Sequence, residues 1–154
     1  MKGQYQISVT VFGKQHSKVL LRNNANVGDI VCLSGQLGNG LFAMQNFKKF
    51  NKKNRTSSGY LKPKALIDYG KTIAGLASSA IDISDGFLQD LGHLSKASNV
   101  GFQLSSSLIP HNSNLSLNQC LNCGDDYQLI FTVPKKYIQP LTKKMKRKKL
   151  AMYQ

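Results

Sequence analysis

The stretch that decides the fold is "SSAIDISDGFLQDLGHL", Ser78–Leu94. Its first half carries a short apolar run typical of a buried strand, formed by Ala80, Ile81 and Ile83. In its second half the apolar side chains recur at helical spacing, at Phe87, Leu88, Leu91 and Leu94. The pattern predicts a strand over 79–83 and a helix over 85–97, with Asp82 and Asp85 at the junction between them.

Asp82 and Asp85 form the first candidate site. Residues three apart do not share a face of a strand, so the two carboxylates converge only if the chain turns at Ser84. No lysine or arginine lies between Lys71 and Lys96, so two close carboxylates would repel unless they share a proton or a cation. Such oxygen ligands suit Mg²⁺, which bridges carboxylates to phosphates. The alternative is that Asp85 only caps the helix and Asp82 is hydrogen-bonded at the sheet end.

A second acidic pair lies in "CGDDYQLIFTV", Cys123–Val133. Asp125 and Asp126 come just before a predicted strand over 127–133, again at the boundary of an element. Two acidic pairs at strand ends are the arrangement that a metal-phosphate site needs. The sequence does not determine whether the two ends meet.

The composition is strongly basic. The 154 residues include 21 Lys and Arg against 7 acids, all of them Asp, and the formal net charge is +14. Five acids fall in the interior of the chain, at Asp82, Asp85, Asp90, Asp125 and Asp126. The positive charge favours phosphate-bearing partners such as a nucleotide, a nucleic acid or an anionic membrane surface. The alternative is AT-rich coding, which raises the lysine content without a selected partner.

The cysteines and the hydropathy indicate a soluble, cytoplasmic protein. Three cysteines without an apparent secretory leader fit a reducing compartment. Cys120 and Cys123 have the Cys-x-x-Cys spacing, but no second pair completes a zinc site, so we expect neither a metal nor a redox role for them. No apolar run approaches the ~20 residues of a membrane span.

The remaining patterns predict one α/β domain with a mixed β-sheet flanked by helices. The other predicted strands cover 4–12, 30–34 and 101–104, and the other predicted helices cover 41–47 and a segment starting at Pro63. A basic connection over 48–64 is expected to be flexible. The stretch from Lys135 to Gln154 is rich in lysine, which predicts a frayed helix or a solvated tail.

Four stretches carry a resemblance to a known family: "ISVTVFG", "LLRNNANVGDIVCLSGQLGNG", "SAIDISDGFLQDLGHLSKASNVGFQL" and "CGDDYQLIFTVP". In this order they resemble the thiamine-monophosphate kinases of the PurM-like (aminoimidazole ribonucleotide synthetase-related) superfamily, over most of residues 3–134. The resemblance implies a PurM C-terminal-like domain over 23–134. Residues 1–22 would be a strand and linker of an N-terminal domain, and 135–154 a basic tail.

The implied activity is transfer of the γ-phosphoryl group of ATP, with Mg²⁺, onto thiamine monophosphate to give thiamine diphosphate. Positioning and charge neutralisation supply most of the catalysis in such a reaction. The matching positions are Arg22 and Ser84 for ATP, Asp82 and Asp85 for magnesium, and Asp125, Asp126 and Tyr127 for the thiamine phosphate.

The chain also departs from the family pattern. Asn39 replaces a usual aspartate, Cys123 a usual glycine, and Asp125 and Gln128 usual glutamates. The family enzyme has further metal-binding aspartates in an N-terminal domain, so we expect this chain to be a truncated form that is inactive alone. A separate N-terminal half or a homodimer would complete it. The alternatives are an inactive remnant of the kinase and a basic nucleic-acid-binding module, although aromatic and basic residues do not alternate as in single-strand binders.

Overall fold

The computed structural model describes residues 7–14, 18–46 and 60–154. Three strands and five α-helices are named within these ranges, together with one 3₁₀ turn, η2 (Ser106–Leu108). In chain order they are β1 (Asp29–Leu33), α1 (Asn39–Gln45), α3 (Ile67–Ile73), β2 (Ser79–Asp82), α4 (Phe87–Ser98), α5 (Leu117–Asn122), β3 (Leu129–Pro134) and α6 (Lys135–Arg147).

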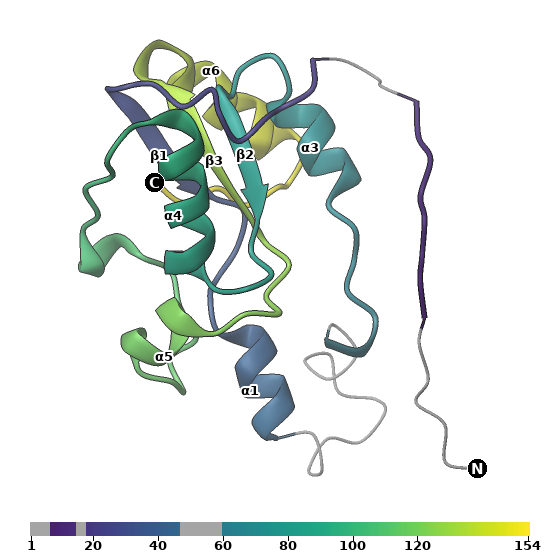
Figure 1. The fold of residues 1–154 in the computed structure, drawn as a ribbon. Coiled ribbons are helices and arrows are strands. Elements are labelled where there is room, and N and C mark those ends of the chain that lie inside the picture. The colour runs from purple at the N-terminus through teal and green to yellow at the C-terminus, as the bar shows by residue number, and fades with distance from the viewer. Residues whose placement is uncertain (1–6, 15–17, 47–59) are drawn as a thin grey trace.

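The three strands form one sheet in the order β1-β3-β2 (Figure 1). Both edge strands pair antiparallel with β3, in registers that place Cys32 and Ala80 opposite Phe131. Because side chains of a strand alternate between faces, Ile130 and Phe131 point to opposite sides of the sheet. The central strand β3 is therefore buried on both faces, and its one polar side chain, Thr132, is hydrogen-bonded to the hydroxyl of Ser79 (2.8 Å).

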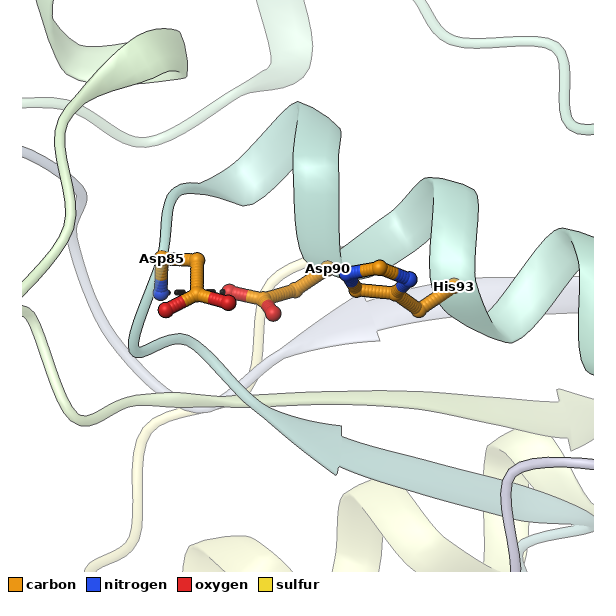
Figure 2. Close-up of side chains that lie close together, drawn as sticks. All are labelled: Asp85, Asp90 and His93. Atoms are coloured by element: carbon orange, nitrogen blue, oxygen red, sulfur yellow. Dashed lines mark hydrogen bonds between the residues drawn. The ribbon is translucent and has the colours of Figure 1, made fainter.

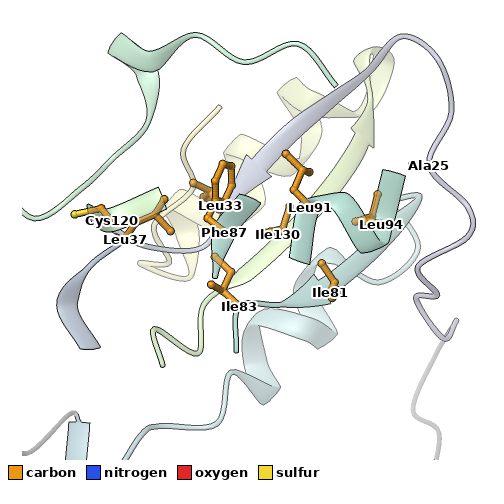
Figure 3. Packing of buried hydrophobic residues seen from close by; sticks show 10 residues of the cluster. All are labelled: Ala25, Leu33, Leu37, Ile81, Ile83, Phe87, Leu91, Leu94, Cys120 and Ile130. Carbon is orange, nitrogen blue, oxygen red and sulfur yellow. The ribbon is translucent and has the colours of Figure 1, made fainter. Parts of the chain in front are cut away.

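One face of the sheet is covered by α4. Figure 3 shows Phe87, Leu91 and Leu94 of this helix packed toward Ile81 and Ile130 of the sheet. The helical spacing of these three side chains matches the apolar stripe that such packing needs. This packing fixes the position of the turn between β2 and α4.

The opposite face is covered by α3 and α6. Ile73 of α3 and Leu141 of α6 are fully buried and pack with Phe131 of β3. Lys144 of α6 donates a 2.8 Å hydrogen bond from Nζ to the carbonyl oxygen of Thr72, in the last turn of α3. A cation near helical C-terminal carbonyls is favourable, so this contact helps to join the two helices.

The prediction of a frayed helix or solvated tail after residue 134 is wrong. Helix α6 runs for 13 residues, and Ile138, Leu141 and Met145 bury its apolar side. Beyond the helix, Tyr153 exchanges backbone hydrogen bonds with Leu33 of β1. The 3-and-4 spacing of the three apolar residues was the visible signal of this packing, and the surrounding lysines obscured it.

The strand predicted over 4–12 is also wrong for its described part. Residues 7–12 form no regular element, and Ile7, Val9 and Val11 are 80–87% exposed. Residues 4–6 lie outside the described residues. An alternating sequence favours a strand, but a strand also needs a partner, and none pairs with it in the part of the chain that the structure describes.

Other predictions need smaller corrections. Residues 101–104 do not form the predicted strand. Their backbone is irregular, and Phe102 packs against the apolar cluster between α4 and the sheet. The helix expected from Pro63 begins at Ile67, and the mixed sheet consists of antiparallel pairs with only isolated parallel bridges among the residues described. Of the connection expected over 48–64, residues 48–59 lie outside the described ranges. The α/β class and the strand-to-helix junction at 82–87 are confirmed.

Candidate nucleotide and phosphate site

The two acidic segments lie side by side. The amide of Ile83 donates to the carbonyl of Gln128 (2.8 Å), and the amide of Tyr127 donates to the carbonyl of Ile83 (2.9 Å). One step further, the amide of Asp125 donates to the carbonyl of Ser84 (3.1 Å). The antiparallel pairing of β2 with β3 thus continues past both strands and joins the acidic pairs that the sequence left separate. We name residues 82–86 with 124–128 the acidic junction.

Glycine allows the close approach of the two segments. A Cβ atom on Gly124 would lie 2.2 Å from the carbonyl oxygen of Ser84. On the other side of the junction, a Cβ atom on Gly40 would lie 2.5 Å from the carbonyl oxygen of Asp125. Both contacts are with backbone atoms, which cannot rotate away, so only glycine fits at these positions.

Asp126 faces the interior. Its Oδ2 atom accepts the amide of Gly38 (2.7 Å) and its Oδ1 atom accepts the amide of Gly40 (3.0 Å). Burial raises the pKa of Asp126, and the hydrogen bonds from these amides oppose the rise. The side chain expected at the thiamine phosphate thus fixes the glycine-rich turn before α1, a role that sequence reasoning missed.

Asp90 has a comparable role and was not predicted as a functional residue. Its Oδ2 atom accepts the backbone amides of Ser84 (3.0 Å), Asp85 (3.1 Å) and Gly86 (3.2 Å). The side chain is 2% exposed and reaches back across the first turn of α4, as Figure 2 shows for its bond to Asp85. The signal was its position four residues after the cap Gly86, within reach of the free amides of a helix start.

Three carboxylates of the junction face solvent: Asp82, Asp85 and Asp125. Asp82 ends β2 and lines a pocket of about 610 Å³ together with Arg22. Asp85 accepts a weak 3.4 Å hydrogen bond from the Gln89 side chain. The structure therefore places two predicted site residues, Arg22 and Asp82, in one pocket, with Asp85 on the turn that follows.

Asp125 and Tyr127 form the second part of the site. Both have left-handed backbone angles, with φ of 62° and 49°, which non-glycine residues adopt uncommonly. The Tyr127 hydroxyl donates to Oδ1 of Asp125 (2.9 Å), and this bond is the main cause of a raised Tyr127 pKa. They line a neighbouring pocket of about 420 Å³, which Lys64 also lines. The charge of Asp82 also raises the pKa of Tyr127, by a smaller amount, so Asp82 lies close enough to Tyr127 to act on it electrostatically.

Metal-ligating side chains gather at one place among the described residues. Asp85, Asp90 and His93 have ligand atoms within 4.8 Å of one another (Figure 2). Asp90 already accepts three amides through Oδ2, so it serves the fold first. Asp82 is not in this group, and the pairing of Asp82 with Asp85 as magnesium ligands remains a prediction.

The cysteines are not in reactive surroundings. Burial raises the pKa of Cys32 to about 12 and that of Cys123 to about 11, and it also raises the pKa of Cys120. Thiolate is the form that binds metals and attacks disulfides. The thiols are therefore protonated at neutral pH in the folded chain.

Comparisons with known proteins identify the relatives of this chain. Thiamine-monophosphate kinase of Buchnera aphidicola subsp. Schizaphis graminum is 37% identical over an alignment of 162 positions, which covers 95% of this chain and 50% of the relative. The Escherichia coli K12 thiamine-monophosphate kinase is 35% identical over 76% of this chain and 40% of its own length. No family model matches the sequence.

Solved structures agree with these relatives. Thiamine-monophosphate kinase from Stenotrophomonas maltophilia superposes with a TM-score of 0.79 at 26% identity, over 88% of this chain and 48% of that chain. The structure described as "AaThiL complexed with AMPPCP and TMP" gives a TM-score of 0.72 at 29% identity, over 87% and 46% of the two chains.

Two further facts bound the assignment. No helix within the described residues is both long and apolar enough to cross a membrane. The chain spans about half the length of the curated relatives that it matches. Over that span, sequence and fold agree, and the chain belongs to the thiamine-monophosphate kinase family.

Proposed function

We propose that this chain supplies part of a thiamine-monophosphate kinase site, which converts ATP and thiamine monophosphate into ADP and thiamine diphosphate. The observation that carries the proposal is the acidic junction. Segments some 40 residues apart in sequence are joined by backbone hydrogen bonds, and Asp82, Asp85 and Asp125 remain exposed there. The AaThiL relative, described with AMPPCP and TMP, supports a nucleotide and a thiamine phosphate as the two ligands.

The residues divide between the two ligands. Arg22 would neutralise phosphate charge on the nucleotide, from the pocket that it shares with Asp82. Asp125 and Tyr127, in the neighbouring pocket, would orient the thiamine phosphate, with Lys64 as the nearby cation. An oxygen of that phosphate attacks the γ-phosphorus, the bond to the β–γ bridging oxygen breaks, and ADP leaves with its electron pair.

The donor set fits magnesium. Asp82 and Asp85 offer exposed carboxylate oxygens on one short turn, and this chemistry suits Mg²⁺ better than the buried, protonated thiols do. When bound, the ion supplies charge neutralisation on the transferring phosphates. Asp90 would support it indirectly, because it orients the amide of Asp85.

A second polypeptide or a second copy would complete the site. In the exposed stretch 7–12, apolar and polar side chains alternate, so Ile7, Val9 and Val11 would share one face of an extended strand. Such a pattern fits a strand that pairs with a sheet of another polypeptide. We propose that this stretch pairs with the part of the enzyme that this chain does not match in its relatives. Homodimer formation through the same stretch is the alternative arrangement.

The test is formation of thiamine diphosphate from ATP and thiamine monophosphate with Mg²⁺. We expect no turnover by the chain alone. We expect turnover when the part of the Buchnera relative that this chain does not match is added as a separate polypeptide. Asp82→Asn should abolish that turnover, and Lys96→Gln, a distant exposed position, should not.

Two results would overturn parts of the proposal. Turnover at an ordinary enzymatic rate by the chain alone would remove the need for a partner. Failure of turnover with the added polypeptide, together with no binding of nucleotide by the chain, would favour the inactive remnant.

A further inference from the structure

A basic surface lies on α6, outside the acidic junction. Eight of the 21 Lys and Arg residues fall within residues 135–149, and no acid follows Asp126. Seven of the eight are exposed: Lys135, Lys136, Lys143, Lys146, Arg147, Lys148 and Lys149. We name these seven residues the basic face. Lys144 is different, because it binds the carbonyl of Thr72 within the fold.

Packing fixes the direction of the basic face. Since an α-helix turns by about 100° per residue, the five helical members lie within an arc of about 120°. Ile138, Leu141 and Met145 lie on the other side of the helix and are buried against the sheet. The charges are therefore presented outward together on a rigid support, which a solvated tail would not provide.

The charges at the start of α6 oppose its stability. Lys135 and Lys136 occupy the first turn, which carries no acidic residue. The N-terminus of a helix carries partial positive charge, so cations there are unfavourable and a bound anion relieves the repulsion. AT-rich coding would place lysines without regard to the fold, so removal of the same charge elsewhere on the chain is the control for the basic face.

We propose that the basic face binds the phosphate backbone of nucleic acid without sequence preference. Tyr137, the aromatic residue of α6, is half-buried, and the Lys136 ammonium lies 5.0 Å from its ring centroid. The face therefore offers cations to phosphates rather than a row of aromatic rings to bases. An anionic membrane is the less suitable partner, because an amphipathic helix binds a bilayer by inserting its apolar side, and in α6 that side is already buried in the fold. This inference is independent of the proposed kinase site, which lies at the acidic junction.

The test is fluorescence anisotropy of a labelled 20-nucleotide single-stranded RNA with the full chain, between 50 and 200 mM NaCl. We expect a Kd of roughly 10⁻⁶ to 10⁻⁴ M that weakens steeply with salt and changes little with RNA sequence. The variant Lys143→Gln/Lys146→Gln removes two phosphate contacts, so the slope of log K against log salt should fall by about 1.4. Lys62→Gln/Lys96→Gln removes the same charge elsewhere and should leave the slope unchanged. Circular dichroism melts of both variants establish that they are folded.

Three results would overturn the proposal. Equal loss of affinity in the two double variants would mean that the overall positive charge of the chain, and not the basic face, determines RNA binding. Binding could be absent at 50 mM NaCl with the wild-type chain at 1 mM. Vesicles containing phosphatidylserine could bind the chain while RNA does not, which would assign the face to a membrane.

Discussion

The inner and outer sides of the acidic junction use the same residue type for different purposes. On the inner side, Asp90 and Asp126 are buried and accept five backbone amides between them. On the outer side, Asp82, Asp85 and Asp125 are exposed. Because buried carboxylates need donors, the inner pair stabilises the turns on which the outer three are displayed. Substitutions on the two sides should therefore have different consequences. Those on the inner side should lower the stability of the fold, and those on the outer side should weaken ligand binding.

The largest effect on stability is expected at Asp126. In Asp126→Asn the side-chain NH₂ group would face one of the two glycine amides, so a buried donor would lose its acceptor. We expect the free energy of unfolding to fall by about 2–3 kcal/mol. Asp125→Asn is the matched control, since Asn tolerates a positive φ, and it should change stability by less than about 0.5 kcal/mol. Urea unfolding measures both. Equal losses in the two variants would contradict the division into inner and outer sides.

The next effect is expected where the two segments touch. Gly124→Ala places a Cβ atom against the carbonyl oxygen of Ser84, so the segments must separate, at a cost of about 2 kcal/mol. Gly92 lies exposed in α4 with nothing within 4 Å of an added Cβ atom. Gly92→Ala should instead stabilise the chain by about 0.5–1 kcal/mol. Thermal melts that show the same sign for both changes would contradict the close packing of the junction.

A smaller loss is expected at Asp90. Asp90→Asn keeps one acceptor oxygen but removes the charge that the three amides of the turn stabilise, at a cost of about 1 kcal/mol. Asp85→Asn should cost little, because the carboxylate is exposed and its side-chain bond from Gln89, within the described residues, is long and weak. Urea titrations at low ionic strength compare the two variants. A greater loss for Asp85→Asn would make Asp85 the structural residue.

The smallest effect concerns pH. The pKa of Asp126 is raised above its ordinary value of 3.8, so the folded chain binds this proton more tightly than the unfolded chain. The stabilisation of the folded chain by this proton is fully present below pH 3.8, and it is lost as the pH rises through the raised pKa of Asp126. The difference in unfolding free energy between wild type and Asp126→Asn should therefore be largest in acid and shrink as the pH rises. A difference that grows with pH would mean that the amides outweigh burial.

Local patterns predicted much of the fold. The apolar run before Asp82 and the helical spacing after Phe87 placed β2 and α4 to within a few residues, because both depend on burial of adjacent side chains. The pairing of residues 82–85 with 125–128 depends on contacts between distant segments, which periodicity does not encode. The same limit explains the error over 7–12, where a strand-like pattern has no partner strand among the described residues.

The position of the candidate site was predicted in part. The sequence singled out Asp82, Asp85 and Asp125 because acids at strand ends are unusual in apolar surroundings; all three side chains are exposed, and their ligand roles stay predictions. The inner role of Asp126 was missed, since adjacent aspartates look alike until the path of the backbone separates them. No role was predicted for Asp90, because periodicity does not show that a helical side chain folds back onto the start of its own helix.

The most direct test of the division between inner and outer aspartates is the melting temperature of wild type and Asp85→Asn, each with and without Mg²⁺ and ADP. If Asp85 holds a metal-nucleotide complex, the ligand stabilises the folded wild-type chain by mass action. We predict a clear rise in melting temperature for wild type with Mg²⁺ and ADP, no rise for Asp85→Asn, and nearly equal melting temperatures for the two proteins without ligand. An equal rise in both proteins, or no rise in wild type, would contradict the assignment of the exposed aspartates to ligand binding.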